Sequence, residues 1–242
     1  KICIEKAKSV IILSDESHEY TTTHIDVLAM KTLMLISQLK LQNIKNVLVE
    51  VKEQQTVKLI HDYIAKNSDL GSKILPILPD ELMGRLIAQT LLMPELNKVY
   101  KELFSFDGVE FYSIPKQDPL NFIKMHTSAI PIYELNDQLY VLSENKHSIE
   151  HTRQEPLSAY HTLKFNGVKR YIEKHIVIFG SNHKLPFILD SIRLYDKENK
   201  TQTKVTLIDS NDPNMIKETT SKLSQIDHIL ILSADDLKPE EY

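Results

Sequence analysis

Short, continuously apolar runs alternate with amphipathic stretches along the first third of the chain. The runs are rich in β-branched residues, as in KSVIIL and NVLVEV, which is typical of strands buried on both faces of a parallel sheet. The stretches between them repeat their apolar residues every three or four positions, which indicates helices with one buried face. This alternation predicts βαβ units and a parallel sheet over residues 1–78. The predicted strands are 8–13, 46–51 and 73–78, and the predicted helices are 25–41 and 54–66.

Two further helical patterns follow, and Pro94 separates them. Because a proline inside a helical pattern ends or kinks the helix, we predict a helix-turn-helix crossover over residues 79–106 that begins at Pro79. Both helices carry more apolar residues than a single solvent-facing helix requires. They form either a hairpin within a core or an interface between subunits. The residues that would form this interface are Leu82, Leu86, Leu91, Leu96, Val99 and Leu103.

The pattern then changes twice more along the chain. Alternating strands, joined at one point by a turn at Asn136-Asp137, predict a small α+β lobe over residues 107–170. Residues 171–242 return to the parallel-sheet pattern, which predicts the first half of a second Rossmann-like lobe. In the α+β lobe the predicted strands are 109–114, 130–135 and 138–143. In the last lobe the predicted strands are 175–180, 204–209 and 227–233, and the predicted helices are 184–195 and 213–223.

A short internal repeat supports the comparison of the first and last lobes. Residues 9–16 read SVIILSDE and residues 228–235 read HILILSAD, so each copy is an apolar strand closed by Leu-Ser and acidic residues. The first copy is the first strand of the N-terminal half-lobe, and the second copy is the last strand of the C-terminal half-lobe. We therefore predict an α/β fold with two tandem Rossmann-like repeats, each of which the chain contains in part.

Composition narrows the class of protein. The chain has 242 residues, with 29 basic and 33 acidic ones, so the net charge of −4 argues against a broad nucleic-acid-binding surface. No apolar run approaches the roughly 20 residues that a membrane-spanning helix needs. Cys3 is the single cysteine, which excludes an internal disulfide and favours a reducing compartment. These features predict a cytoplasmic globular region that binds no nucleic acid.

The chain resembles the cytosolic regulatory region of the Castor/Pollux family of ion channels, and more broadly RCK (regulator of potassium conductance) domains. The segments that carry the resemblance are AKSVIILSDE, HIDVLAMKTLML, NVLVEV, ILPDELMGRLIAQTLLMPELNKVYKELFSFDGVEFY, HIVIFGSNHKLPFILDSI, KVTLIDS and HILILSADDLKPEEY. The long fourth segment is the most specific, since it is similar to that family's crossover helix, turn and entry to the C-terminal lobe.

The resemblance implies a regulatory function and a set of partners. It implies a tetrameric cation channel in which every subunit supplies two RCK units to a gating ring at the cytoplasmic face of the cell membrane. The ring would sense an ion or a nucleotide and couple it to pore opening. The membrane pore would belong to the same polypeptide and precede this chain. The interface residues named above would then join subunits in the ring.

An acidic cluster follows the first predicted strand. Asp15 and Glu16 come directly after this strand and Glu50 ends the next one, and ligands of open α/β sheets bind at the carboxyl ends of strands. Carboxylates grouped in this way predict a calcium site, with a solvated acidic loop as the alternative. Calcium-gated RCK domains carry two acids on the second strand, whereas here Lys52 stands near the place of the second acid.

A second candidate site lies in the last lobe. Gly180, Ser181 and Asn182 follow a strand and precede a helix, where backbone amides bind phosphate, and Asp209 ends the next strand, where an acid accepts a ribose hydroxyl. The full G-x-G-x-x-G pattern is absent, and an ordinary helix cap explains Ser181 or Asn182 equally well. The residues thus leave the ligand open between calcium and a nucleotide.

Catalytic motifs are weak throughout the chain. His147, Glu150 and His151 match the H-x-x-E-H pattern of one class of zinc proteases, but the surrounding residues are polar and indicate no helix, so a surface segment is expected. No Ser-His-Asp or Cys-His signature is present. We therefore expect no enzymatic activity. The alternative is a soluble NAD-dependent oxidoreductase, or another nucleotide-binding protein, built on the same Rossmann elements.

Overall fold

The computed structural model describes residues 6–16, 21–39, 43–67, 74–105, 108–126, 128–152, 174–209 and 229–233. The chain divides into two compact units. The first unit combines Lys1–Ala88 with Glu173–Tyr242, and the second unit is Gln89–Ile172. The fold is mixed α/β with parallel sheets, as the sequence predicts. No finding tests the predicted boundaries after residues 78, 106 and 170, which stay predictions.

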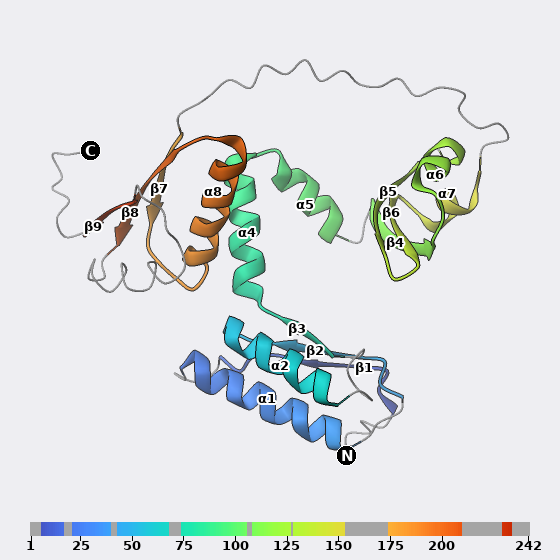
Figure 1. Cartoon of the computed structure of the whole chain (residues 1–242), viewed down its shortest axis with the longest axis horizontal. Coiled ribbons are helices and arrows are strands. Elements are labelled where there is room, and N and C mark those ends of the chain that lie inside the picture. Colours follow the sequence, from blue (N-terminus) through green and yellow to red (C-terminus); the bar gives the residue numbers. More distant parts are fainter. Residues whose placement is uncertain are drawn as a thin grey trace. The chain divides into compact units, whose positions relative to one another are not determined.

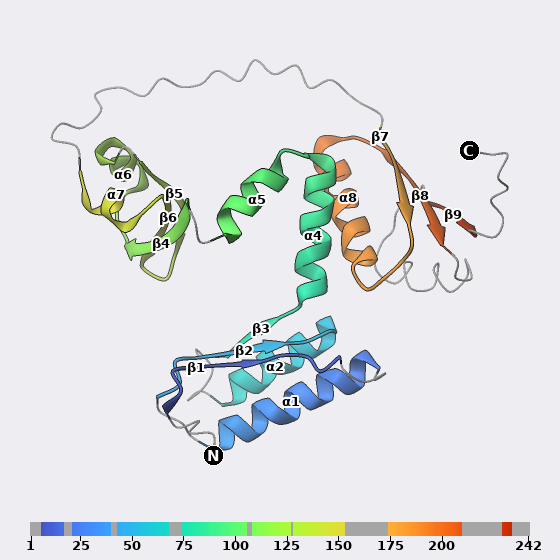
Figure 2. The same cartoon turned by 180° about the vertical axis from the view of Figure 1, so that it is seen from behind.

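The first sheet is a three-stranded parallel sheet in the order β1-β2-β3. Figure 1 and Figure 2 show that both connecting helices cover the same face, as two right-handed crossovers in one direction require. Leu33 from the first helix, Val49 from the central strand and Ile60 from the second helix are fully buried in this core. The elements are β1 (Ser9–Ile12), α1 (Thr22–Gln38), β2 (Asn46–Glu50), α2 (Gln54–Lys66) and β3 (Ile74–Ile77).

One face of this sheet is not buried, which corrects the prediction of strands buried on both faces. Ile11, Leu48 and Leu75 lie opposite one another across the three strands. Ile11 is 63% exposed and Leu75 is 50% exposed. The apolar runs are continuous along the strands, but the two helices cover a single face, so only alternate residues such as Val47 and Val49 enter the core.

The second sheet has the same parallel arrangement, in the order β7-β8-β9. Its core consists of strand residues such as Val205 and Leu207 packed on Leu189 and Ile192 of the helix. This helix continues four residues beyond its predicted end and closes with Lys200 in the left-handed conformation. The predicted helix 213–223 lies outside the described residues. The elements are β7 (Lys174–Phe179), α8 (Leu185–Asn199), β8 (Thr203–Asp209) and β9 (Ile229–Ser233).

Helix α4 (Pro79–Leu92) packs closely on α8. A Cβ atom on Gly84 would lie 2.8 Å from the carbonyl oxygen of Lys184 and 2.8 Å from Cβ of Phe187, so only glycine fits this approach. The ammonium of Lys184 pairs with the carboxylate of Asp80 at 2.9 Å. Phe187 also packs against the core of the first sheet. Glycine at position 84 therefore sets the close approach of these two helices.

The second unit contains an antiparallel sheet in the order β4-β6-β5. The predicted turn is present, with positive φ angles of 47° at Asn136 and 58° at Asp137, as in tight two-residue hairpins. Asp118 caps a helix that was not predicted from the sequence, although Asp-Pro is a common helix start. The elements are α5 (Leu96–Phe104), β4 (Glu110–Pro115), α6 (Pro119–Met125), β5 (Ala129–Leu135), β6 (Gln138–Ser143) and α7 (Lys146–Glu150).

Candidate functional site

The carboxyl ends of β1 and β2 are joined by a network of polar side chains. Glu50 ends β2, and its Oε2 accepts a hydrogen bond of 3.2 Å from the backbone N–H of Ser14, in the loop after β1. The other oxygen, Oε1, accepts a hydrogen bond of 3.2 Å from Nζ of Lys52. The same ammonium forms an ion pair with Glu16. Both carboxylate oxygens of Glu50 are therefore engaged by groups of the protein.

Burial and pairing act on the two central charges in opposite directions. The side chain of Lys52 is 12% exposed and that of Glu50 is 19% exposed. Burial alone would raise the pKa of Glu50, but the hydrogen bonds from Ser14 and Lys52 outweigh it and hold the pKa below its ordinary value. Burial alone would lower the pKa of Lys52, but the hydrogen bonds to Glu16 and Glu50 raise it. Both groups are therefore held in their charged forms.

A second set of hydrogen bonds fixes the backbone beside Lys52. Asp26 of α1 is 2% exposed, and its carboxylate accepts hydrogen bonds from the backbone N–H groups of Lys52, at 2.7 Å, and Glu53, at 3.0 Å. The side chain of Glu53 accepts hydrogen bonds of 2.7 Å from the hydroxyls of Thr22 and Thr23. Sequence reasoning missed Asp26 and Glu53. The available signal was a charged residue on the apolar face of a helix, between Ile25 and Ala29.

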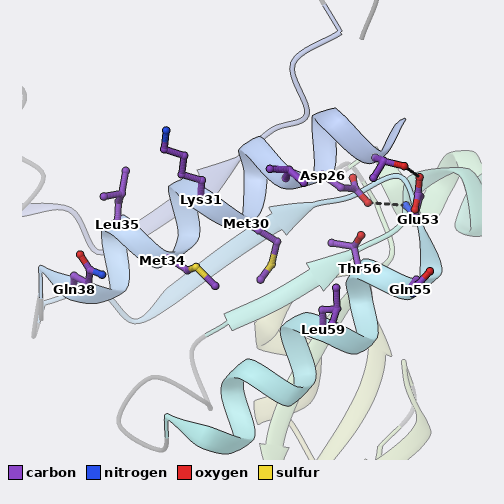
Figure 3. A pocket seen from close by; sticks show the side chains of 12 residues that line it. Asp26, Met30, Lys31, Met34, Leu35, Gln38, Glu53, Gln55, Thr56 and Leu59 are labelled. Atoms are coloured by element: carbon purple, nitrogen blue, oxygen red, sulfur yellow. Dashed lines mark hydrogen bonds between the residues drawn. The ribbon is translucent and has the colours of Figure 1, made fainter. Parts of the chain in front are cut away.

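A groove with a volume of about 660 Å³ lies between α1 and α2. Figure 3 shows Met30 and Met34 of α1 and Leu59 of α2 directed into the space between the helices. The hydrogen bond from Glu53 to Asp26 lies at one end of the groove in the same view. The Asp26–Glu53 network therefore shapes one end of this groove as well as the strand-end cluster.

The structure brings two of the three predicted calcium ligands together. Glu16 and Glu50 both form ion pairs with the ammonium of Lys52, and Asp15 is exposed in the loop beside them. Within the described ranges, no group of three or more His, Cys, Asp and Glu side chains is placed to hold a metal ion. No finding tests calcium binding itself, and the calcium site stays a prediction.

The predicted nucleotide-site residues lie at one edge of the second sheet. Gly180 follows β7 with a φ of +80°, its N–H donates to the carbonyl of Ile208, and a Cβ atom there would meet no heavy atom within 4 Å. Ser181 and Asn182 are exposed. Asp209 ends β8 on the same edge, but it is only 3% exposed. Space is therefore open beside Gly180, whereas a ribose would reach the Asp209 carboxylate only after this group became accessible.

The first turn of α8 already uses several of its backbone donors. The Oδ1 atom of Asn182 accepts a hydrogen bond of 2.9 Å from the N–H of Lys184, and the carbonyl of Asn182 accepts one of 3.0 Å from Leu185. Pro186 has no N–H, and the N–H of Phe187 donates to Lys184. The N-cap of α8 is Lys184, which has no side-chain capping hydrogen bond, so neither Ser181 nor Asn182 is the ordinary helix cap that the sequence left open. No finding tests nucleotide binding, which stays a prediction.

The six predicted interface residues are exposed or half-buried. Leu82 is 53% exposed, Leu91 is 45% exposed and Val99 is 48% exposed. Helix α5 contributes no buried residue, although its apolar side chains share one face. This exposure argues against the core-hairpin alternative for α5. The interface between subunits stays a prediction.

The H-x-x-E-H segment forms one helical turn, so the expectation of no helix there was wrong. Asn145 caps this turn by accepting a hydrogen bond from the N–H of Ser148. The rings of His147 and His151 have centroids 3.8 Å apart, and Nδ1 of His151 lies 3.0 Å from the carbonyl oxygen of His147. Glu150 pairs with Lys146 instead. A capping asparagine inside a polar segment was the signal that sequence reasoning did not use.

No protein-family model matches the chain. One relative is an ion channel. The chain is similar to the ion channel POLLUX of Lotus japonicus, with 27% identity over 128 residues, which is 50% of this chain and 12% of that protein. The similarity supports a relationship to Castor/Pollux-type channels, and the chain spans a small part of the relative's length.

Among the helices that the structure describes, none is both long enough and apolar enough to cross a membrane.

Proposed function

We propose that the chain is a regulatory, gating-ring region of a Castor/Pollux-like cation channel, at the cytoplasmic face of the cell membrane. Its two parallel sheets would be parts of two tandem RCK units, which sense an ion or a nucleotide and couple it to a pore in the same polypeptide. The similarity to POLLUX over half of the chain carries this proposal. The two parallel βαβ sheets suit it, since such sheets bind ligands at their carboxyl ends.

The exposed helices α4 and α5 provide the proposed contact between subunits. Gating requires that subunits act together, and several apolar residues of these helices keep about half of their surface exposed within the chain. A second copy that covered them would gain roughly 25 cal/mol for each Å² of apolar surface removed from water. The proposal therefore includes self-association through Leu82, Leu86, Leu91, Leu96, Val99 and Leu103.

Light scattering on the whole chain tests this association. Leu82→Asp combined with Leu91→Asp places two charges on the exposed face of α4 without entering a core, because both side chains are already about half exposed. We expect the mass of an oligomer for the unchanged chain and the mass of one chain for the double variant. Asn97→Asp, which adds one charge at an exposed polar position of α5, is the matched control and should leave the mass unchanged. An unchanged mass in the double variant would refute this interface.

A binding experiment tests the sensing part of the proposal. Titration calorimetry of the whole chain with ATP, ADP or NAD should give heat for one nucleotide class if the edge beside Gly180 is the sensing site. Asn182→Ala removes an exposed side chain at this edge and should weaken that binding. Reduction of NAD to NADH by a hydride-donating substrate would instead favour the oxidoreductase alternative.

A further inference from the structure

We infer that Lys52 is the resident cation of the strand-end cluster and determines its ligand specificity. Its ammonium fills the position between Glu16 and Glu50 that a divalent ion would need, so this edge of the first sheet takes up no calcium in the unchanged chain. The inference concerns the cluster itself and holds whether or not the chain is part of a channel. It makes the opposite prediction to the calcium site expected from the sequence.

The carboxylates of Glu16 and Glu50 are already engaged by groups of the protein. Calcium binds six to eight oxygen atoms at about 2.3–2.6 Å. In Glu50, Oε1 accepts from Nζ of Lys52 and Oε2 accepts from the N–H of Ser14, both at 3.2 Å. Glu16 pairs with the same ammonium. An ion at this place would therefore have to break contacts to Lys52, to Ser14 or to both.

The backbone of Lys52 is held in place at its own N–H and at the N–H of each neighbouring residue. Its own N–H donates to Asp26 at 2.7 Å, the N–H of Val51 donates to the carbonyl of Ile77 at 2.9 Å, and the N–H of Glu53 donates to Asp26 at 3.0 Å. The side chain is 12% exposed. The ammonium is thus fixed at the strand ends by the fold rather than extending into solvent.

The charge of Lys52 offsets part of the negative charge of Glu16 and Glu50. Glu16 and Glu50 bring two negative charges and Lys52 brings one positive charge within a single cluster. Neutralising Lys52 would leave two carboxylates near one another without their shared cation, and like charges that share a site disfavour each other's charged form. A lysine is therefore sufficient to hold the loop after β1 against the end of β2 in the absence of a bound metal.

Calcium titration of the whole chain tests this inference. For the unchanged chain we expect no calcium heat and no change of Tm up to millimolar calcium. Lys52→Met keeps most of the unbranched side chain and removes the charge. It should lower the Tm by about 2–4 °C, and calcium should restore part of that loss. Lys58→Met, at an exposed position of α2, is the matched control and should show neither effect.

Hydrogen exchange at the Ser14 amide supplies a local readout that does not depend on global unfolding. We expect slow exchange in the unchanged chain and in the Lys58→Met control, and faster exchange in Lys52→Met and in the milder Glu16→Gln variant. Calcium heat in the unchanged chain that Glu50→Gln removes would overturn the inference. So would a Lys52→Met variant with unchanged Tm, or one whose Tm does not respond to calcium. None of these outcomes depends on the oligomeric state on which the proposed function rests.

Discussion

The carboxyl ends of the two parallel sheets are built differently. At the end of β1 and β2, charged side chains bind one another and the backbone: Lys52 joins Glu16 and Glu50, and Asp26 accepts two N–H groups. At the end of β7 and β8, the N–H of Gly180 donates to the carbonyl of Ile208, and space lies open beside the glycine. Both edges have the strand arrangement to which α/β proteins bind ligands.

This difference indicates at which edge a ligand would have to displace fewer existing contacts of the protein. A ligand at the first edge has to displace groups that already satisfy one another. A ligand beside Gly180 meets open space, although several N–H groups of the first turn of α8 are already used. The same topology therefore gives one edge where charged side chains bind one another and one edge with open space beside a glycine. The experiments below test this contrast, beginning with the largest expected effect.

Asp26→Ala should have the largest effect, because it removes the buried acceptor of two backbone N–H groups. A hydrogen bond to a charged group contributes about 1.5–3 kcal/mol, so we expect a loss of about 3 kcal/mol in the free energy of unfolding. Urea unfolding followed by circular dichroism measures this. Asp62→Ala, at an exposed position of α2, is the control and should change the free energy by less than about 0.5 kcal/mol. Equal effects of the two variants would contradict the described role of Asp26.

Gly180→Ala tests the second edge and should have an intermediate effect. The added Cβ meets no atom within 4 Å, so the cost comes from the φ of +80° alone. Placing an ordinary residue in this conformation costs about 1–2 kcal/mol, and we expect a loss of about 1.5 kcal/mol in urea unfolding. Gly180→Asn should lose less, since asparagine tolerates this region better. A loss as large as that of Asp26→Ala would show that this edge is packed and not open.

The pH dependence of the Glu50–Lys52 pair should show the smallest effect. The pKa of Glu50 lies below its ordinary value of 4.5, so its contribution is present above this pH and disappears as the pH falls through the folded value. The pKa of Lys52 lies above its ordinary value of 10.5, so its contribution is present below this pH and disappears as the pH rises through the folded value. Between the two ordinary values both contributions are complete.

The unchanged chain and Lys52→Met should therefore differ by about 1 kcal/mol in the free energy of unfolding near pH 7. The difference should shrink as the pH falls below 4.5, because protonation of Glu50 breaks the pair. Urea titrations at several pH values measure this, with Lys58→Met as the reference. A difference that stays constant down to about pH 2 would mean that Lys52 stabilises the fold by packing and not by its charge.

Much of the fold was predictable from local patterns. The strands at 46–50 and 74–77 and the helix Gln54–Lys66 are close to their predicted ranges, because apolar spacing differs between strands and helices. The turn at Asn136-Asp137 was predictable because few residues tolerate positive φ at both positions. The helix Pro119–Met125 was missed, since seven residues are too few to show a clear period. Local patterns thus predict long elements better than short ones.

The place of the candidate site in the fold was predictable, but the contacts among its residues were not. The sequence by itself determined that Glu16, Glu50 and Lys52 lie near one sheet edge, because successive parallel strands end on the same side. Only the tertiary structure decided that the lysine binds both carboxylates and that Asp26, 26 residues away from Lys52 along the chain, holds its backbone. It also decided that one face of the first sheet stays exposed. The periodicity of apolar residues predicts which face of a local element can be buried. Whether that face is buried, and which charges pair, depends on which distant segments pack against it.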